Sequence, residues 1–279
     1  MQQFSYGNPD FGQVALHGGD DLLRKLTVLS LALILVAGIS AQELKIAAAS
    51  DLTAAMQKIA AAFTRQTGVQ VKFSFGSSGN FFAEIRNGAP FDVFLSADRS
   101  YPDTLDQSGR ADQGTTIYAK GKLVLWTSNG STVDLSAEEL RALTGPKVSK
   151  VAIANPEHAP YGRAAVAAMV HFKVYDQVKP KLVLGENVSQ AAQFAQSGNA
   201  DVAIIALSLA LSDTMKKTGR YALVALDSYP PLEQAAMVLH SSQYKKDAHR
   251  FVDFLLSPAA QKILGEYGFE TRGPEAQRR

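Results

Sequence analysis

The sequence predicts an α/β fold in which mostly parallel sheets are covered by helices on both faces. From Leu44 onward, short apolar runs typical of buried strands alternate with stretches in which apolar residues recur at helical spacing. This alternation is typical of strand–helix–strand units, whose crossover connections bring parallel strands together. No Pro- or Gly-rich linker divides the sequence, so two lobes would require the chain to cross between them more than once.

The expected strands are the apolar runs, and most are rich in Val, Ile, Leu and Phe. They lie at Leu44–Ala48, Val69–Phe75, Phe91–Leu95, Leu123–Trp126, Val151–Ala154, Leu182–Leu184, Val202–Ala206 and Ala235–Leu239. Strands without a polar face are typical of sheets that helices cover on both sides.

The clearest expected helix is Leu52–Arg65, because its apolar residues recur at three- and four-residue spacing and Gly68 follows as a stop signal. The other expected helices begin near Asn80, Tyr161 and Val188, and two more lie between Lys245 and Tyr267, separated at Ser257-Pro258.

Composition excludes several classes of function. The 279 residues suffice for one large domain or two modest ones, and a net charge of +2 argues against a nucleic-acid-binding surface. The absence of cysteine excludes a thiolate metal site, a cysteine nucleophile and a disulfide framework.

The start of the chain predicts export. Arg24 and Lys25 precede the apolar run Leu26–Val36, and small residues follow it up to Ala41. This is the pattern of a secretory signal, and the run is shorter than the roughly 20 apolar residues of a membrane-spanning helix. We therefore expect residues 1–41 to be an extension plus a signal peptide, and the mature protein to be periplasmic.

Polar, Gly-rich or Ser-rich segments follow four of the expected strands and precede a helix. They are Ala49-Ser50-Asp51, Gly76-Ser77-Ser78-Gly79-Asn80, Asn155–Gly162 and Gly185-Glu186-Asn187-Val188. Each alone could be an ordinary helix cap or turn. Ligands of open α/β sheets bind beyond the carboxyl ends of strands, where helix N-termini offer free N–H groups and partial positive charge. Together, the four segments predict an anion site built from neutral donors.

Several motifs resemble those of the periplasmic molybdate-binding proteins of ABC importers. The resemblance spans about residues 43–272. The motifs are Glu43–Ser50, Phe75–Gly79, Asn87–Asp98, Gly121–Trp126, Asn155–Gly162, Gly198–Val202, Pro258-Ala259-Ala260 and Tyr267-Gly268-Phe269.

The resemblance implies a two-lobed periplasmic-binding-protein fold of type II, with the ligand in the cleft between the lobes. Lobe 1 would comprise residues 43–121 and 232–279, and lobe 2 residues 122–231. The chain would cross between them near Lys120–Leu123 and Leu232–Ala235. Closure of the lobes around the ligand would then create the form that the importer recognises.

Carried over residue by residue, the resemblance implies an oxyanion site at Ser50, Asp51, Ser78, Tyr161 and Val188. Ser50 and Ser78 would give hydroxyl and backbone donors, and Tyr161 and Val188 backbone N–H groups. At Asp51 we expect only the N–H to face the anion, with the carboxylate turned away to cap the helix.

Two positions depart from the family pattern. Many members have a tyrosine contact in the stretch that matches Ile204–Leu207, and here the matching residue is Ala206. A second branch of the family instead uses a polar residue directly after the first hydroxyl residue, and here that position is Asp51. These departures leave the fifth ligand contact open.

We expect the ligand to be molybdate or tungstate, bound as the oxyanion through these residues, with no cofactor and no catalytic residue. The expected partner is the membrane permease of an ABC importer, and we expect a monomer that binds no nucleic acid. The main alternative is another oxyanion, such as sulfate or thiosulfate, in the same scaffold. His158 beside Glu157 is the only hint of acid–base chemistry, and no nucleophile–base set accompanies it.

Overall fold

The computed structural model describes residues 1–3, 7, 43–135 and 139–271. Contacts divide the chain into residues 1–42 and 43–279, and the fold below is that of the second unit. The predicted signal segment lies almost entirely outside the described residues. Among the described residues, no helix has both the length and the hydropathy needed to cross a membrane.

The first sheet has six strands in the order β11-β4-β10-β3-β1-β2. The strands are β1 (Glu43–Ala49), β2 (Gln70–Gly76), β3 (Val93–Ser96), β4 (Ala111–Gly121), β10 (Leu232–Leu239) and β11 (Glu270–Thr271). β1 pairs in parallel with β2 and β3, whereas β10 runs antiparallel to β3 and β4, and β11 antiparallel to β4.

The second sheet has five strands in the order β7-β6-β8-β5-β9. The strands are β5 (Leu123–Ser128), β6 (Val151–Ala154), β7 (Leu182–Gly185), β8 (Val202–Ala206) and β9 (Gly219–Leu223). β6 pairs in parallel with β7 and β8, and β5 runs antiparallel to β8 and β9. We call the first sheet with its helices the first lobe, and the second sheet with its helices the second lobe.

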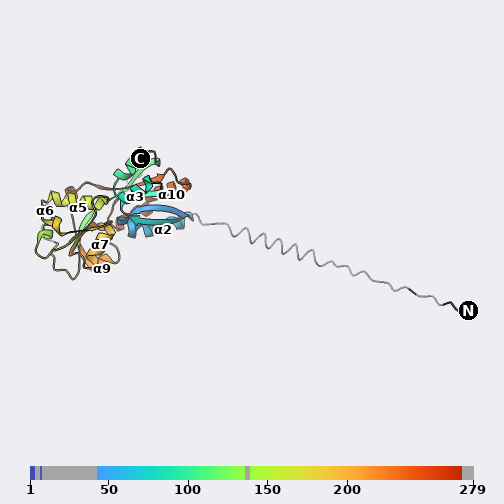
Figure 1. Cartoon of the computed structure of the whole chain (residues 1–279), viewed down its shortest axis with the longest axis horizontal. Helices are drawn as coiled ribbons and strands as arrows, with labels where there is room; N and C mark the ends of the chain where they lie inside the picture. Colours follow the sequence, from blue (N-terminus) through green and yellow to red (C-terminus); the bar gives the residue numbers. More distant parts are fainter. Residues whose placement is uncertain (4–6, 8–42, 136–138, 272–279) are drawn as a thin grey trace. The chain divides into compact units, whose positions relative to one another are not determined.

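Helices pack on both sheets (Figure 1). The first lobe carries α2 (Thr53–Thr67), α3 (Ser78–Arg86), α4 (Ser100–Gln107), α10 (Lys245–Leu255) and α11 (Pro258–Glu266). The second lobe carries α5 (Pro160–His171), α6 (Tyr175–Val178), α7 (Val188–Gln196), α8 (Leu207–Ala210) and α9 (Met215–Thr218). Short 3₁₀ turns complete the chain at η1 (Ser50–Leu52), η2 (Glu139–Thr144), η3 (Lys179–Lys181) and η4 (Leu226–Ser228).

The apolar stripe predicted for the first helix forms the core of the first lobe. Met56, Ile59 and Phe63 of α2 are fully buried, and the Phe63 ring lies 5.2 Å from that of Phe251 in α10. Gly68 ends α2 with a positive φ of 76°, a conformation that glycine adopts without steric cost.

The two-lobed α/β fold is confirmed, but its sheets are mixed rather than mostly parallel. Every predicted strand is present within a few residues, whereas the sequence reading missed β4, β9 and β11. These three strands have few fully buried residues, because they lie at or next to a sheet edge, and they therefore lack an apolar run. Each of the three pairs antiparallel with its neighbours, and so do two predicted strands, β10 with β3 and β5 with β8; together these pairings make both sheets mixed.

The chain passes between the sheets at two adjacent places. β4 ends at Gly121, and β5 begins at Leu123 in the other sheet, while the return runs from η4 into β10. The two passages lie side by side, since Leu232 pairs with Gly121. This path supports the proposed lobe boundaries at residues 121/122 and 231/232.

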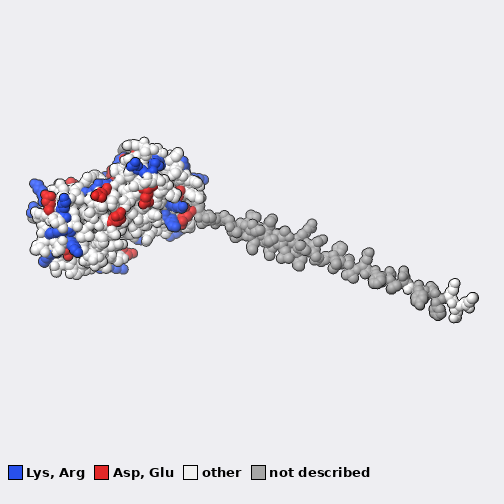
Figure 2. Space-filling view, viewed as in Figure 1, with Lys and Arg blue, Asp and Glu red and all other residues white. Residues whose placement is uncertain are grey.

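Surface charge is mixed in sign. On the face drawn in Figure 2, basic and acidic side chains are interspersed over the described residues.

Candidate oxyanion-binding site

A small pocket lies between the lobes at the carboxyl ends of several strands. It is lined by Ala49, Ser50, Asp51, Gly76, Ser77, Ser78, Ala97, Ala159, Pro160, Tyr161, Asn187 and Val188. All five residues predicted to bind the oxyanion are in this set, although they come from four separate segments of the chain. The structure therefore brings together what the sequence placed at four strand–helix junctions.

Four helical N-termini meet at the pocket. η1 begins at Ser50, α3 at Ser78, α5 at Pro160 and α7 at Val188. Within the described residues, no side chain caps η1, α3 or α5. In α7, Asn187 accepts the N–H groups of Ser189 and Gln190 at 3.0 and 3.1 Å. Uncapped first turns leave backbone N–H groups available to an anion.

The two serines are held so that their hydroxyl protons can serve a ligand. Ser78 is fully buried, and its Oγ accepts the N–H of Ala97 at 3.0 Å. The Oγ of Ser50 accepts the N–H of Ser189 at 3.4 Å. A hydroxyl that accepts one bond still has its own proton to donate. Both serines are thus oriented as donors.

Asp51 is buried with its carboxyl directed toward the first sheet. Its Oδ2 accepts the Gln234 side-chain amide of β10 at 2.8 Å, and Oδ1 has no partner among the described residues. Burial raises the pKa of this carboxyl to about 7, and hydrogen bonds from Tyr161 and Gln234 offset part of the rise. The carboxylate is therefore engaged away from the helix start.

One detail predicted for Asp51 is wrong. We expected the carboxylate to cap the following helix, but neither η1 nor α2 has a side-chain cap among the described residues. The reason is that the carboxyl accepts hydrogen bonds from the Gln234 amide and the Tyr161 side chain instead of from the N–H groups at the helix start. The predicted separation of roles, with the side chain turned from the ligand, remains a proposal.

Tyr161 is only 2% exposed, and its side chain extends toward the passage between the lobes. Its hydroxyl lies so close to Gly121 that a side chain at that position would have no room. Burial and the neighbouring Asp51 raise the pKa of the Tyr161 phenol well above its usual range, so the phenol stays protonated. With the ring committed to this contact, the backbone is the part of Tyr161 that can face a ligand.

Ala206, the position at which the resemblance implied a tyrosine in many family members, lies at the end of β8 opposite Leu123. It is fully buried and lies outside the set that lines the pocket. That this protein lacks the tyrosine contact with the oxyanion therefore remains a proposal.

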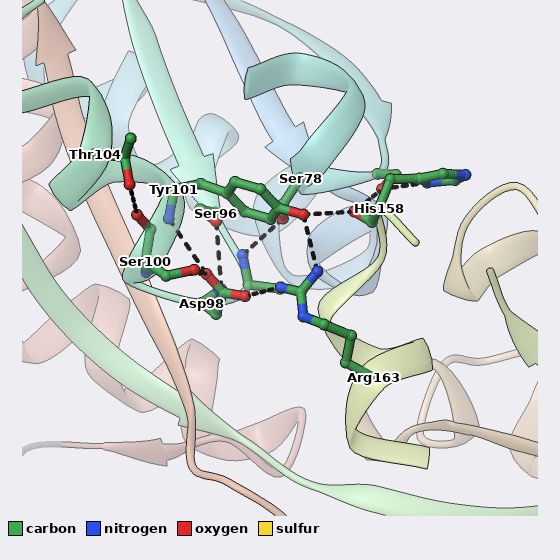
Figure 3. Close-up of polar contacts among 10 residues, drawn as sticks. Ser78, Ser96, Asp98, Ser100, Tyr101, Thr104, His158 and Arg163 are labelled. Carbon is green, nitrogen blue, oxygen red and sulfur yellow. Dashed lines mark hydrogen bonds and ion pairs between the residues drawn. The ribbon is translucent and has the colours of Figure 1, made fainter. Parts of the chain in front are cut away.

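His158 contacts the first lobe through its backbone as well as its ring (Figure 3). Its carbonyl accepts the Ser77 hydroxyl at 2.6 Å and the Gly79 N–H at 2.9 Å, and its Nδ1 lies 3.0 Å from Ser77 Oγ. These contacts join the loop before α5 to the turn that carries Ser78. The sequence reading missed Ser77 and this role of His158, because a contact between lobes leaves no local pattern.

Residues 44–270 match the family of bacterial extracellular solute-binding proteins. The chain belongs to this family. As a member of an extracellular family, this solute-binding protein acts outside the cytoplasm.

The solute-binding protein is 39% identical to a molybdate-binding protein of Rhodobacter capsulatus, over 88% of this chain and 95% of that one. The solved structure of the periplasmic molybdate-binding protein of Azotobacter vinelandii superposes with a TM-score of 0.77. That pair is 34% identical over 82% of this chain and 99% of the other. The resemblance predicted from the motifs is confirmed.

A sulfate-binding protein of Mycobacterium tuberculosis also superposes, with a TM-score of 0.71 and 17% identity, over 84% of this chain and 88% of the other. Similarity at that level shows the shared fold alone. The shared fold therefore does not identify the anion, which depends on the residues of the pocket.

Proposed function

We propose that this protein captures molybdate or tungstate in the periplasm and delivers it to the membrane permease of an ABC importer. The observation that carries the proposal is that Ser50, Asp51, Ser78, Tyr161 and Val188 line one small pocket. We further propose that the protein reaches the periplasm through a signal peptide within residues 1–41, acts as a monomer and has no catalytic role.

Neutral donors suffice for the charge of the ligand. Among the described residues that line the pocket there is no Lys, Arg or His. A dianion in a buried pocket needs each oxygen to be hydrogen-bonded. Each hydrogen bond to a charged acceptor contributes roughly 1.5–3 kcal/mol, and helix N-termini add partial positive charge. Two hydroxyls, the Val188 N–H of α7, and the N–H groups in the first turns of η1, α3 and α5, apart from that of Gly79, supply such a set.

Size gives the selectivity. Molybdate and tungstate are nearly the same size, and sulfate is smaller. Donors fixed by helix starts and buried serines cannot follow a smaller anion inward, because close-packed interiors resist collapse. We therefore expect sulfate to leave some of these donors unsatisfied.

Binding closes the cleft. The donors at Ser50 and Ser78 belong to the first lobe, and those at Tyr161 and Val188 to the second. Only a closed arrangement lets one anion reach both pairs, so the ligand stabilises closure. The permease then distinguishes the loaded protein by its closed shape.

The test is a thermal-shift panel with molybdate, tungstate, sulfate, phosphate and thiosulfate. A ligand at 100 times its dissociation constant adds about 2.7 kcal/mol of stability. We expect a clear rise of Tm with molybdate and tungstate and little with the others. A rise with sulfate or thiosulfate alone would favour the alternative anions. Unchanged Tm with molybdate and tungstate would contradict the proposal.

A further inference from the structure

An ion pair joins the two lobes beside the pocket. Arg163 lies in the first turn of α5, two residues after Tyr161, and its guanidinium points back to Asp98 in the first lobe (Figure 3). Asp98 lies in the short loop between β3, which ends at Ser96, and α4, which begins at Ser100. Because Asp98 belongs to the first lobe and Arg163 to the second, the contact requires the two lobes to lie against each other.

Tyr101 of α4 completes the contact. Its hydroxyl accepts a hydrogen bond from Arg163 Nη1 at 2.8 Å and donates to the His158 carbonyl at 3.3 Å. The Arg163 guanidinium also lies 5.1 Å from the centre of the Tyr101 ring. The phenol therefore connects the start of α5 to the loop that precedes it.

The acidic partner is held in place by its own lobe. Asp98 Oδ1 accepts the N–H and the hydroxyl of Ser100 at 3.0 and 2.6 Å, at the start of α4. Oδ2 remains for Arg163. Because the carboxylate is already oriented, little side-chain freedom is lost when the lobes close.

The same region brings three donors of the first lobe to one carbonyl of the second. Ser77, Gly79 and Tyr101 all donate to the His158 oxygen. Ser77 and Gly79 flank Ser78, and His158 lies three residues before Tyr161. The contacts thus hold the first turns of α3 and α5, which both face the oxyanion pocket, in one relative position.

Arg163 does not act as a ligand. It lies outside the described set that lines the pocket, and its charge is matched by Asp98. The pocket thereby keeps its neutral donors. Because its charges are matched, the ion pair can position the groups around the pocket without adding a positive field that would attract every anion equally.

We propose that Arg163, with Asp98 and Tyr101, is an interlobe clamp that positions the start of α5 over the bound oxyanion and slows its release. This inference rests on the proposed function and assigns the residence time of the ligand to side chains that never touch it. The clamp exists only when the lobes are closed, so its loss raises the dissociation rate more than it lowers the association rate.

The experiment measures the release of molybdate from the full chain by stopped flow. Arg163→Gln and Asp98→Asn should each speed release by about tenfold, a loss of roughly 1.4 kcal/mol, with association changed far less. Arg163→Lys, which keeps the charge but not the planar fork, should give an intermediate rate. Added salt should speed release from the native protein and have less effect on the two neutral variants, because the pair is partly exposed.

A double-mutant cycle separates the clamp from a general loss of stability. The double variant Asp98→Asn/Arg163→Gln should release molybdate no faster than either single variant, because one shared interaction is lost in all three. Lys216→Gln is the control, since Lys216 pairs with Asp213 inside the second lobe, and it should release at the native rate. Additive effects, or native release from the single variants, would overturn the proposal.

A second measurement keeps the clamp testable if molybdate does not bind. Spin labels on the two lobes report the fraction of closed molecules in the ligand-free chain. Arg163→Gln should lower that fraction relative to the native chain and to Lys216→Gln. An unchanged distance distribution would refute the clamp, whereas failure of molybdate to bind with a changed distribution would refute only the proposed function.

Discussion

Asp51 is the residue at which the site departs most from a simple set of donors. A carboxyl with one unpartnered oxygen, 1% exposed, lies next to Ser50 and beside the buried Tyr118 and Tyr161 hydroxyls. Burial without full hydrogen bonding disfavours the ionised form, which is why the pKa of Asp51 rises to about 7. Under the proposed function, a charge that close to a dianion must be weakened or turned away; the raised pKa and the Gln234 contact both support this proposal.

We predict that Asp51→Asn stabilises the ligand-free protein increasingly as the pH rises from 4 to 7. In the unfolded chain this carboxyl has an ordinary pKa of 3.8, whereas in the folded chain its pKa is about 7. Below pH 4 both states hold the proton, so the folded state loses nothing. Between the two values only the unfolded state ionises, and native stability falls by up to about 4 kcal/mol before levelling above pH 7.

The measurement is Tm of the native protein and the variant across this pH range. Asp253→Asn, on the exposed face of α10, is the control and should differ little from native at every pH. A gap between native and Asp51→Asn that is constant with pH would contradict the prediction. The same variant should bind molybdate as well as the native protein or better, because a negative charge near the dianion is removed; a large loss would count against the turned carboxylate.

The hydroxyl of Ser78 gives a second prediction at this scale. Ser78→Ala removes one donor to the anion, which should weaken molybdate binding by about 10- to 150-fold, equivalent to 1.5–3 kcal/mol. Isothermal titration measures the change, with the exposed Ser241→Ala as the matched control. A loss below twofold would mean that Ser78 does not contact the ligand.

At the scale of elements, the candidate site is formed where the N-termini of several helices converge. The turn from Gly76 to Gly79 carries α3 to within contact of the loop before α5. A Cβ at Gly79 would lie 2.5 Å from the His158 carbonyl oxygen and 2.6 Å from the Tyr101 hydroxyl. Close approach of two backbones, rather than an unusual backbone angle, explains why glycine is required there.

We therefore predict that Gly79→Ala weakens molybdate binding without unfolding either lobe. The added methyl group forces the two helix starts apart, so anion affinity should fall by about tenfold or more, a loss of roughly 1.4 kcal/mol. Circular dichroism checks the fold, and titration checks the affinity. Gly265→Ala in α11, where a Cβ meets nothing within 4 Å, is the control and should bind normally. Native affinity in Gly79→Ala would show that the approach is not needed for binding.

The sequence predicted the elements that carry strong local patterns. Buried apolar runs such as Val151–Ala154 and Val202–Ala206 match β6 and β8 residue for residue, because both strands lie inside a sheet. The edge strand β9 escaped prediction because its side chains are mostly exposed. Asp98, Arg163 and Gln234 escaped it for a different reason. Their roles depend on partners 65 or more residues away along the chain, and local residue spacing does not predict such distant contacts.

At the scale of the whole molecule, two lobes line one pocket. Ser50 and Ser78 of the first lobe face Tyr161 and Val188 of the second there, and two adjacent passages of the chain join the lobes. Such a connection permits rotation of one lobe against the other with few changes of backbone angle.

We predict that molybdate makes the protein more compact. Small-angle X-ray scattering should show a smaller radius of gyration with molybdate than without it, because the anion stabilises the closed form. An anion that gives no thermal shift serves as the control and should leave the curve unchanged. Identical curves with and without saturating molybdate would contradict ligand-driven closure.

The order of strands in the first sheet also governs how the protein can be made. β10 lies between β3 and β4, yet the ribosome produces it only after the whole second sheet. Until Leu232–Leu239 emerge, β3 keeps an open edge and β4 has no neighbour, whereas the five strands of the second sheet are contiguous in sequence and can already pair. Closing such a long loop is slow. We therefore expect the second lobe to form before the first, wherever the chain folds, because the first sheet is incomplete until Leu232–Leu239 are available.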